Sequence, residues 1–315
     1  MGMKVVALAG GIGAARFLGG LVRAVEPADL TVVANTADDI RLHGLHVSPD
    51  LDTIAYTLGG GVNTEQGWGR ADESLAVATE LAERYGQPAW FTLGDRDIAT
   101  HLLRTRVLAE GGTLTQATAE IAAAWRLPFR LLPMSDDLVT TRIVTADGRD
   151  LGFQQWWVGE RAGPDVAEVR FAGAATATPA PGVLGAIAGA DAVVLCPSNP
   201  VVSIGPILAV PGVEATLRHA PVVGISPIVG GKVVRGMADR LLPAAGSKVS
   251  AAAVAERYAG FLDAWVLDDV DAGEVAAVER LGVRAVTTDT IMRTPQVAAA
   301  VARTALDLLT LVVST

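Results

Sequence analysis

The sequence predicts a single α/β domain over residues 1–315, with a Rossmann-like core in which helices cover both faces of a mainly parallel sheet. Continuous apolar runs that end in glycine or polar residues lie near both ends of the chain, as expected of buried parallel strands. The middle of the chain is richer in helical patterns. We therefore expect a core built from both chain ends, with residues 60–175 inserted as a helical and hairpin subdomain that covers the site.

Composition and charge limit the class of protein. The 315 residues are 50% hydrophobic and 19% charged, a globular balance with ample core material. The net charge is −9 and no basic patch stands out, which argues against a nucleic-acid partner. The single cysteine, Cys196, excludes an internal disulfide and fits a reducing compartment. Glycines and Arg16 interrupt the apolar N-terminus, so we expect a cytoplasmic protein without a membrane span.

The first elements predict a βαβ unit. The apolar run Lys4–Gly10 ends in glycine, a helix is expected from about Ala14 to Val25, and Leu30–Thr36 is a second apolar strand. Ligands of open α/β sheets bind outside the carboxyl ends of the strands. The glycine turn after the first strand and the acidic segment after the second are therefore expected to lie close together.

The middle is predicted to be helical, and the last part returns to strands. "ADESLAVATELAERYG" has helical spacing, and "TLTQATAEIAAAWRL" opens with the capping-box pair Thr113 and Gln116. The Asp-Gly pair at 147–148 predicts a hairpin. "DAVVLCPSNP", "PVVGISPIVGG", "DAWVLDD" and "VRAVTTDT" are apolar runs typical of buried strands. Thr294 and Pro295 are typical of the start of a final helix.

The segment Gly10–Arg16, "GGIGAAR", predicts an anion site. Backbone N–H groups of a glycine turn that leads into a helix bind anions, and Arg16 can add a charged hydrogen bond to a phosphate. The dinucleotide motif G-x-G-x-x-G would need glycine in place of Arg16, and Asn35 stands where that motif expects an acid. A tight strand-to-helix turn without a ligand is the alternative.

Residues 35–53 crowd four aspartates into one irregular segment: Asp38, Asp39, Asp50 and Asp52. Mg²⁺ takes oxygen ligands, often one or two carboxylates together with substrate phosphates. The segment therefore predicts a Mg²⁺ site beside the glycine turn. We favour Asp38 and Asp52 as the ligands, although spacing alone does not rank the four. The alternative is that Asp52 caps a helix and the other carboxylates are solvated.

Polar loops at the ends of the apolar runs complete a pattern that resembles one family. In chain order they read "GGIGAAR", "NTADDIRLHGLHVSPDLDT", "TEQGWGRADES", "FTLGDRDIATH", "PMSDDLVTT", "CPSNPVVSIGPIL" and "SPIVGG". Over nearly the whole chain, this order resembles the CofD/FbiA family, the 2-phospho-L-lactate (or phosphoenolpyruvate) transferases of coenzyme F420 biosynthesis. "NTADD…LHGL…SPDLDT" and "PSNP…SIGPIL" carry most of the resemblance, and the region after Gly152 is less distinctive.

The resemblance implies a Mg²⁺-dependent, phosphotransferase-type reaction with small-molecule substrates. The acceptor is the deazaflavin Fo, and the donor is a guanosine diphosphate that carries a lactyl, enolpyruvyl or related acid on its outer phosphate. The ribityl hydroxyl of Fo attacks that phosphorus, GMP leaves, and F420-0 or its dehydro form results. A guanylyltransferase would supply the donor, and we expect a homodimer.

The resemblance also implies roles for individual residues. Some of the four aspartates hold Mg²⁺ and one takes the hydroxyl proton, which agrees with the needs of phosphoryl transfer. The expected nucleotide-binding residues are Gly10, Gly11, Gly13, Ala14, Arg16, Ser198, Asn199, Pro200, Ser203, Ser226 and Gly230. The residues expected to bind Fo and the transferred acid are Trp68, Arg70, Gly94, Asp95, Arg96, Met134, Ser135 and Asp136.

Other classes of function stay open at this point. A related family of gluconeogenesis-linked regulators shares the glycine turn and binds nucleotide sugars, but would not need "LGDRD" or "SPDLDT" in this form. Arg16 and Asn35 argue against a nicotinamide oxidoreductase. No motif identifies the transferred acid, because lactate, enolpyruvate and glycerate differ only by a hydroxyl or a double bond.

Overall fold

The computed structural model describes residues 2–313 and contains a central sheet of seven strands. Neighbouring strands pair in parallel throughout, which confirms the predicted Rossmann-like α/β fold. The strand order reverses between β1 and β9, so this sheet has a topological switch point there. In spatial order the strands are β5 (Arg130–Pro133), β2 (Leu30–Ala34), β1 (Val5–Ala9), β9 (Ala192–Leu195), β10 (Val222–Ile225), β13 (Ala264–Asp268) and β14 (Arg284–Thr288).

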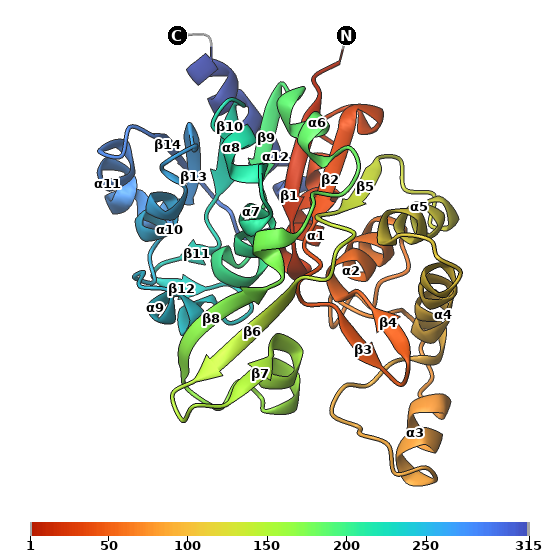
Figure 1. Cartoon of the computed structure of the whole chain (residues 1–315). Coiled ribbons are helices and arrows are strands. Elements are labelled where there is room, and N and C mark those ends of the chain that lie inside the picture. The colour runs from red at the N-terminus through yellow and green to blue at the C-terminus, as the bar shows by residue number, and fades with distance from the viewer. Residues whose placement is uncertain (1, 314–315) are drawn as a thin grey trace.

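Helices cover both faces of this sheet, as Figure 1 shows. Alternate residues of each strand point to opposite faces. In β1, Val5 and Ala7 therefore belong to one hydrophobic core and Val6 and Leu8 to the other. The first core is covered by α1 (Gly11–Leu21), α2 (Pro49–Leu58) and α12 (Pro295–Val313). The second contains α6 (Val183–Ala188), α7 (Gly205–Ala209), α8 (Val213–Leu217), α9 (Ala238–Ala244), α10 (Ala251–Tyr258) and α11 (Val275–Glu279).

The last helix, α12, packs against α1. By length and composition it is apolar enough to cross a membrane, but Val301, Ala302 and Ala305 are buried in the core that it shares with α1. A Cβ atom on Gly20 of α1 would lie 2.2 Å from the carbonyl carbon of Ala298, so only glycine allows the two helices to approach this closely. In this structure α12 is a core helix.

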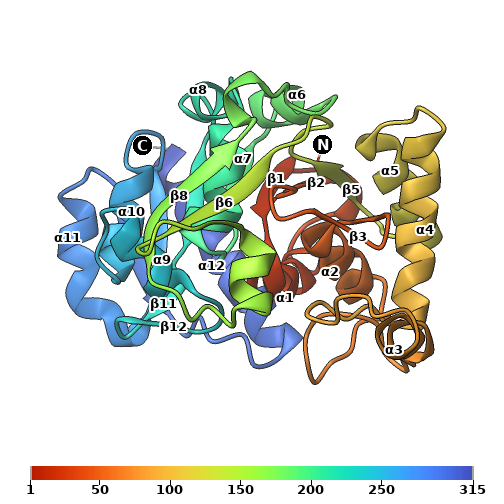
Figure 2. The same ribbon diagram turned by 60° about the horizontal axis from the view of Figure 1, so that its bottom comes forward.

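The expected insertion at 60–175 is interrupted, because β5 belongs to the central sheet. The strand is short, and its apolar residues Leu131 and Leu132 face opposite cores. Before it come α3 (Ala76–Glu83), α4 (Asp95–Ala109) and α5 (Leu114–Ala124). After it come β6 (Thr140–Thr145), β7 (Asp150–Gly152) and β8 (Val166–Ala172), an antiparallel sheet that includes the predicted hairpin. In Figure 2 the two parts flank α1 and α2.

Short elements complete the edge of the sheet at the carboxyl ends of the strands. The hairpin β3–β4 follows β2, and the hairpin β11–β12 follows β10. Two π-helical turns follow β7 and β9. Their bounds are β3 (Ile40–Leu42), β4 (Leu45–Val47), β11 (Ile228–Val229), β12 (Lys232–Val233), Gln155–Gly159 and Pro200–Ile204.

Candidate active site

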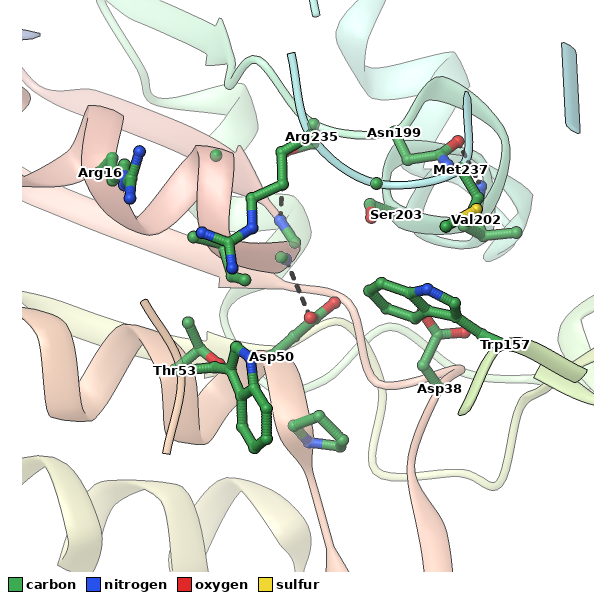
Figure 3. A pocket seen from close by; sticks show the side chains of 18 of the residues that line it. Arg16, Asp38, Asp50, Thr53, Trp157, Asn199, Val202, Ser203, Arg235 and Met237 are labelled. Carbon is green, nitrogen blue, oxygen red and sulfur yellow. Dashed lines mark hydrogen bonds between the residues drawn. The ribbon is translucent and has the colours of Figure 1, made fainter. Parts of the chain in front are cut away.

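A cavity of about 540 Å³ lies at the carboxyl ends of the parallel strands, around the switch point between β1 and β9. Open α/β sheets bind their ligands at this position. Figure 3 shows side chains that line it, from α1, α2, the loop after β9 and the loop after β12. The predicted site residues that line it are Gly10, Gly11, Gly13, Arg16, Asp38, Asp50, Asp52, Trp68, Ser198, Asn199, Ser203 and Ser226.

The glycine turn allows the β9 loop to pack tightly against it. A Cβ atom on Gly10 would lie 2.7 Å from Ser203 Cβ, and one on Gly13 would lie 2.5 Å from the Pro197 carbonyl oxygen. Helix α1 begins at Gly11, three residues before the expected start at Ala14, because Gly10 adopts the extended conformation of an N-cap. Ala14 itself is buried in the core and is not among the described residues that line the cavity.

Asp38 and Asp50 form a buried carboxylate pair beside the glycine turn. The Asn35 side-chain amide donates to both of them, at 3.1 Å to Asp38 Oδ2 and 2.9 Å to Asp50 Oδ2. The Gly11 N–H donates to Asp50 Oδ1 at 2.8 Å. Asp38 Oδ1 is buried and has no hydrogen-bond partner among residues 2–313. Within the described residues no Lys, Arg or His nitrogen lies within 4.0 Å of either carboxylate, so the pair has no cationic partner there.

Burial raises the pKa values of both carboxylates. Desolvation raises the pKa of Asp50 to about 6, against the effect of the Asn35 and Gly11 hydrogen bonds. Desolvation, with repulsion from Asp50, raises the pKa of Asp38 well above its usual range. Paired buried carboxylates favour a proton or a cation between them. The free Asp38 oxygen and the adjacent Asp50 carboxylate therefore fit a hard divalent cation such as Mg²⁺.

Asp52 has a different partner. Both of its carboxylate oxygens accept hydrogen bonds from the fully buried guanidinium of Arg104 on α4, one of them at 3.2 Å from Nη1. Arginine keeps its charge in proteins, so this pair is neutralised from within the protein. The structure therefore favours Asp50 over the predicted Asp52 as the second oxygen ligand beside Asp38.

A second group of possible metal ligands lies next to that ion pair. Ligand atoms of Asp52, Asp97 and His101 all lie within 4.8 Å of one another. His101 Nε2 lies 3.2 Å from Asp97 Oδ2, and the Tyr56 hydroxyl donates to Asp97 Oδ1 at 2.5 Å. Arg104 neutralises Asp52 and the Tyr56 hydroxyl bonds to one Asp97 oxygen, whereas the buried His101 Nε2 has no hydrogen-bond partner among residues 2–313. This group is therefore a second candidate metal site beside the Asp38–Asp50 pair.

This network was not predicted from the sequence. Asp97, His101 and Arg104 recur at i, i+4 and i+7 on α4, a spacing that places them on one helix face. That spacing was the available signal. This face of α4 contacts Asp52 and Tyr56 on α2. Both are distant in the sequence, so the spacing on α4 alone did not show which residues the face contacts.

Asp39 does not line the cavity within the described chain. Its side chain is buried and holds the β3–β4 hairpin, accepting a hydrogen bond from Ser48 Oγ at 2.6 Å and contacting His46 Nε2 at 2.9 Å. Burial raises the pKa of Asp39. These contacts give Asp39 a structural role, while its Oδ1 has no hydrogen-bond partner among residues 2–313 and its catalytic role stays a prediction.

The loops after β9 and β10 use most of their polar groups internally. Asn199 Oδ1 caps the following turn by accepting from the N–H groups of Val201 and Val202, and Ser198 Oγ accepts from the Gly10 N–H. The Ser226 hydroxyl bonds to the Ile228 backbone. Two other predicted nucleotide-binding residues, Pro200 and Gly230, are not among the described residues that line the cavity. Pro200 is buried, and the Gly230 N–H donates to Asp271.

Arg70 lies among aromatic rings and not at the cavity within the described structure. Its guanidinium carbon lies 4.5 Å from the ring centroid of Trp125 and 5.4 Å from that of Tyr56. These are cation–π distances. These contacts hold the loop before α3, and the substrate role of Arg70 stays a prediction.

Gly94, Asp95 and Arg96 form the start of α4. The Asp95 carboxylate accepts from Ser74 Oγ at 2.5 Å and from two N–H groups at the start of α3. The Arg96 N–H donates to Glu73. None of the three lines the cavity in the described part of the chain, and their contacts join α3 to α4; their predicted role in binding Fo stays a prediction.

Contacts within the protein also involve three further predicted substrate-binding residues, Met134, Ser135 and Asp136. Met134 is fully buried in the core, and Ser135 Oγ donates to the Thr178 carbonyl at 2.6 Å. Asp136 accepts from the N–H and hydroxyl of Thr115 in the first turn of α5. This segment continues β5, which explains why it does not line the cavity anywhere in the described structure.

Aromatic residues that the sequence did not single out line the cavity together with Trp68: Trp90, Phe91, Phe153 and Trp157. Trp157 lies in the π-helical turn after β7, with its ring centroid 5.3 Å from that of Phe153. Its neighbour Trp156 is fully buried. In Figure 3 the Trp157 indole points into the cavity on the side of Asp38. The adjacent tryptophans of "QWW" were a visible sequence signal, but the turn places Trp156 in the core and Trp157 at the cavity.

Comparison with known proteins gives a consistent assignment. A profile of the family described as 2-phospho-L-lactate transferase CofD matches residues 5–305. The chain is 53% identical over 312 residues to the phosphoenolpyruvate transferase of Streptomyces griseus, covering 97% of this chain and 98% of the relative. It is 50% identical over 318 residues to that of Thermobifida fusca, again covering 97% and 98%. For the relative of the same name from Mycolicibacterium smegmatis the identity is 43% over 327 residues, with the same coverage.

The fold agrees with a solved structure. Protein BH3568 from Bacillus halodurans superposes with a TM-score of 0.65 at 18% identity, covering 97% of this chain and 100% of that protein. At this identity the similarity shows a shared fold alone. The family assignment rests on the match over residues 5–305 and on relatives about half identical in sequence. The chain therefore belongs to the family of 2-phospho-L-lactate transferase CofD, a family of transferases.

Proposed function

We propose that this chain transfers a phospho-acid group from a guanosine-diphosphate-activated donor to the ribityl hydroxyl of the deazaflavin Fo. The products are GMP and F420-0 or dehydro-F420-0. The observation that carries the proposal is that one cavity contains the Asp38–Asp50 pair, the glycine turn and an aromatic wall. The printed name of the relatives, phosphoenolpyruvate transferase, favours enolpyruvate as the transferred acid.

The proposed step exchanges one phosphorus–oxygen bond for another. The hydroxyl oxygen of Fo bonds to the outer phosphorus of the donor, and the bond from that phosphorus to the bridging oxygen breaks. GMP leaves with the electron pair of the broken bond. The hydroxyl proton passes to an oxygen of the Asp38–Asp50 pair that does not contact the metal. Phosphoryl transfer depends mainly on alignment and on charge neutralisation, which this arrangement can provide.

Different walls of the cavity suit different parts of the substrates. The N–H groups at the start of α1 and the Arg16 guanidinium suit the phosphates of the nucleotide. Ser198, Ser203 and Ser226 also line the cavity and suit the rest of the guanosine. The aromatic wall, including Trp157, suits the planar deazaflavin ring, because flat rings stack on indole faces.

The Asp38–Asp50 pair would hold the Mg²⁺ that the family implies. Bound there, the ion would neutralise charge on the diphosphate during transfer. Gly11 and Asn35 orient Asp50 for this role by donating hydrogen bonds to its two oxygens. The cytoplasmic location, the homodimer and the coupling to a guanylyltransferase stay predictions from the sequence.

A coupled assay tests the reaction. Purified protein is mixed with Fo, Mg²⁺, GTP and an active guanylyltransferase, with 2-phospholactate, phosphoenolpyruvate or 3-phosphoglycerate in separate tubes. Mass spectrometry of the deazaflavin should show a product in the phosphoenolpyruvate tube, and omitting Mg²⁺ should abolish it. If no tube yields a product while the guanylyltransferase is active, the transfer reaction is wrong and a nucleotide-binding regulator becomes the better hypothesis.

A further inference from the structure

Two arginines from distant parts of the chain lie together at the cavity. Arg16 is on α1, and Arg235 is in the loop between β12 and α9. A Cβ atom on Gly67 would lie 3.1 Å from Arg235 Nη1 and 3.7 Å from Arg16 Nη2, so the two guanidinium groups flank one point. Figure 3 shows Arg235 reaching into the cavity, in this view between Arg16 and Asp50.

The protein neutralises neither of these charges. Within residues 2–313, no carboxylate lies within 4.0 Å of the Arg16 or Arg235 guanidinium. Arg293, which also lines the cavity, pairs with Asp289 at 2.8 Å. The chain has 34 acidic and 25 basic residues, so carboxylates are plentiful. Like charges held together repel, and an anion between them removes the repulsion.

A backbone contact holds Arg235 in this position. Its Nη2 donates to the carbonyl oxygen of Gln66, in the loop that also carries Trp68. Asn63 Oδ1 accepts hydrogen bonds from the N–H groups of Glu65 and Gln66, at 3.1 and 3.2 Å, so the carbonyl sits in an ordered turn. An uncharged carbonyl orients the guanidinium but leaves its charge and its other N–H donors available.

We infer that Arg16 and Arg235 form a clamp for the diphosphate of the activated donor. The identity of the donor rests on the proposed function. A guanidinium presents paired donors that match phosphate oxygens, and a diphosphate offers one phosphate group to each arginine. A carboxylate on the transferred acid can also bridge two arginines, but it carries a single negative charge, whereas a diphosphate presents a separate charged group to each arginine. The same Gly67 point lies 3.1 Å from Ile12 Cγ2, which places the clamp over the first turn of α1.

The clamp is tested by binding measurements with Mg²⁺ present, using GDP, inorganic pyrophosphate and guanosine as probes in calorimetry. Arg235→Gln and Arg16→Gln should each weaken GDP and pyrophosphate binding about tenfold or more, the usual effect of losing a charge-assisted hydrogen bond. Guanosine has no phosphate and should bind unchanged. Arg235→Lys should recover only part of the loss, since lysine keeps the charge without the planar fork. The matched control is Arg303→Gln, an exposed arginine on α12.

Each outcome decides between the clamp and its alternatives. Unchanged GDP binding in Arg235→Gln overturns the clamp, and so does an equal loss of guanosine binding, which would show a loop-packing role. A wild-type protein that binds pyrophosphate through both arginines but transfers nothing to Fo would retain the clamp and remove the proposed reaction. An active wild-type enzyme whose Arg235→Gln variant binds GDP normally would support the proposed reaction and rule out the clamp.

Discussion

Asp38, Asp50 and Asp52 come from one acidic segment but have different electrostatic partners. Arg104 neutralises Asp52, whereas Asp38 and Asp50 share only the neutral amide of Asn35. Buried carboxylates without a cation hold protons or bind metal, and their pKa values rise accordingly. The partner, and not the residue type, therefore decides which aspartate is available for chemistry.

Asp38→Asn and Asp50→Asn should separate activity from stability. Each should lower kcat/KM in the coupled transfer assay by about 100-fold or more, because a metal ligand or proton acceptor is lost. The melting temperature of the metal-free protein should stay the same or rise, since each change removes a buried charge. Asp269→Asn, at an exposed position, is the control for both measurements. Full activity in Asp38→Asn would contradict the assignment.

Arg104→Met should mainly lower stability, whereas Asp38→Asn and Asp50→Asn should mainly lower activity. It leaves Asp52 buried without its cation, and breaking such a pair lowers the free energy of unfolding by ~3–5 kcal/mol. Urea denaturation measures this loss. Arg84→Met breaks the exposed Arg84–Glu80 pair and should cost under ~1 kcal/mol. The double variant Arg104→Met with Asp52→Asn should recover part of the loss, and a loss that stays the same would contradict the charge explanation.

At the scale of elements, α1 serves the site at one end and the core at the other. Its first turn faces the cavity, and near its last turn it crosses α12 at Gly20. Glycine is needed at Gly10 and Gly13 for the β9 loop and at Gly20 for α12, but a Cβ atom on Gly19 would meet nothing within 4 Å. Contacts, and not helix propensity, thus explain three of these four glycines.

Gly20→Ala and Gly19→Ala should therefore change stability in opposite directions. Gly20→Ala forces the α12 backbone away and should lower the free energy of unfolding by ~1–3 kcal/mol, as overpacked cores do. Gly19→Ala improves helix propensity without a clash and should raise it by ~0.5–1 kcal/mol. Chemical denaturation of the two variants compares them directly. Destabilisation by Gly19→Ala equal to that by Gly20→Ala would rule out close packing as the cause.

At the scale of the molecule, three parts of the chain enclose one cavity. The parallel sheet supplies the glycine turn and the carboxylates, the antiparallel sheet region supplies Phe153 and Trp157, and the loops around α3 supply Trp68 and Trp90. The polar wall and the aromatic wall of the cavity therefore come from different parts of the chain. This division agrees with a donor rich in phosphate and an acceptor with an aromatic ring.

Trp157→Ala should weaken acceptor binding selectively. Loss of an aromatic stacking surface costs ~1–3 kcal/mol per ring, so the KM for Fo should rise about tenfold. GDP binding should be unaffected, because the glycine turn lies on another wall. Tyr85→Ala removes an exposed aromatic side chain that is not among the described residues lining the cavity, and serves as the control. An equal loss of GDP and Fo binding would instead point to collapse of the cavity.

Local sequence patterns determined the parallel sheet, the glycine turn, the β6–β7 hairpin and the nearness of the acidic segment to that turn. Strand and turn signals depend on neighbours in the chain, so they can be read without a structure. The short strand β5 lacked such a signal. The sequence did not show that its loop continuation, Arg70 and Asp95 lie outside the set of described residues that line the cavity, because their contacts with other parts of the chain are not local.

Only the tertiary structure decided which polar residues serve chemistry. Arg104 lies 52 residues from Asp52, and Arg235 lies 169 residues from its partner Gln66. Whether a carboxylate meets an arginine, an amide or an empty space sets its charge and its availability, and no local pattern contains that information. The sequence by itself therefore determined the fold and the expected place of the site, while the folded chain brought Asp38, Asp50, Trp157 and Arg235 to one cavity.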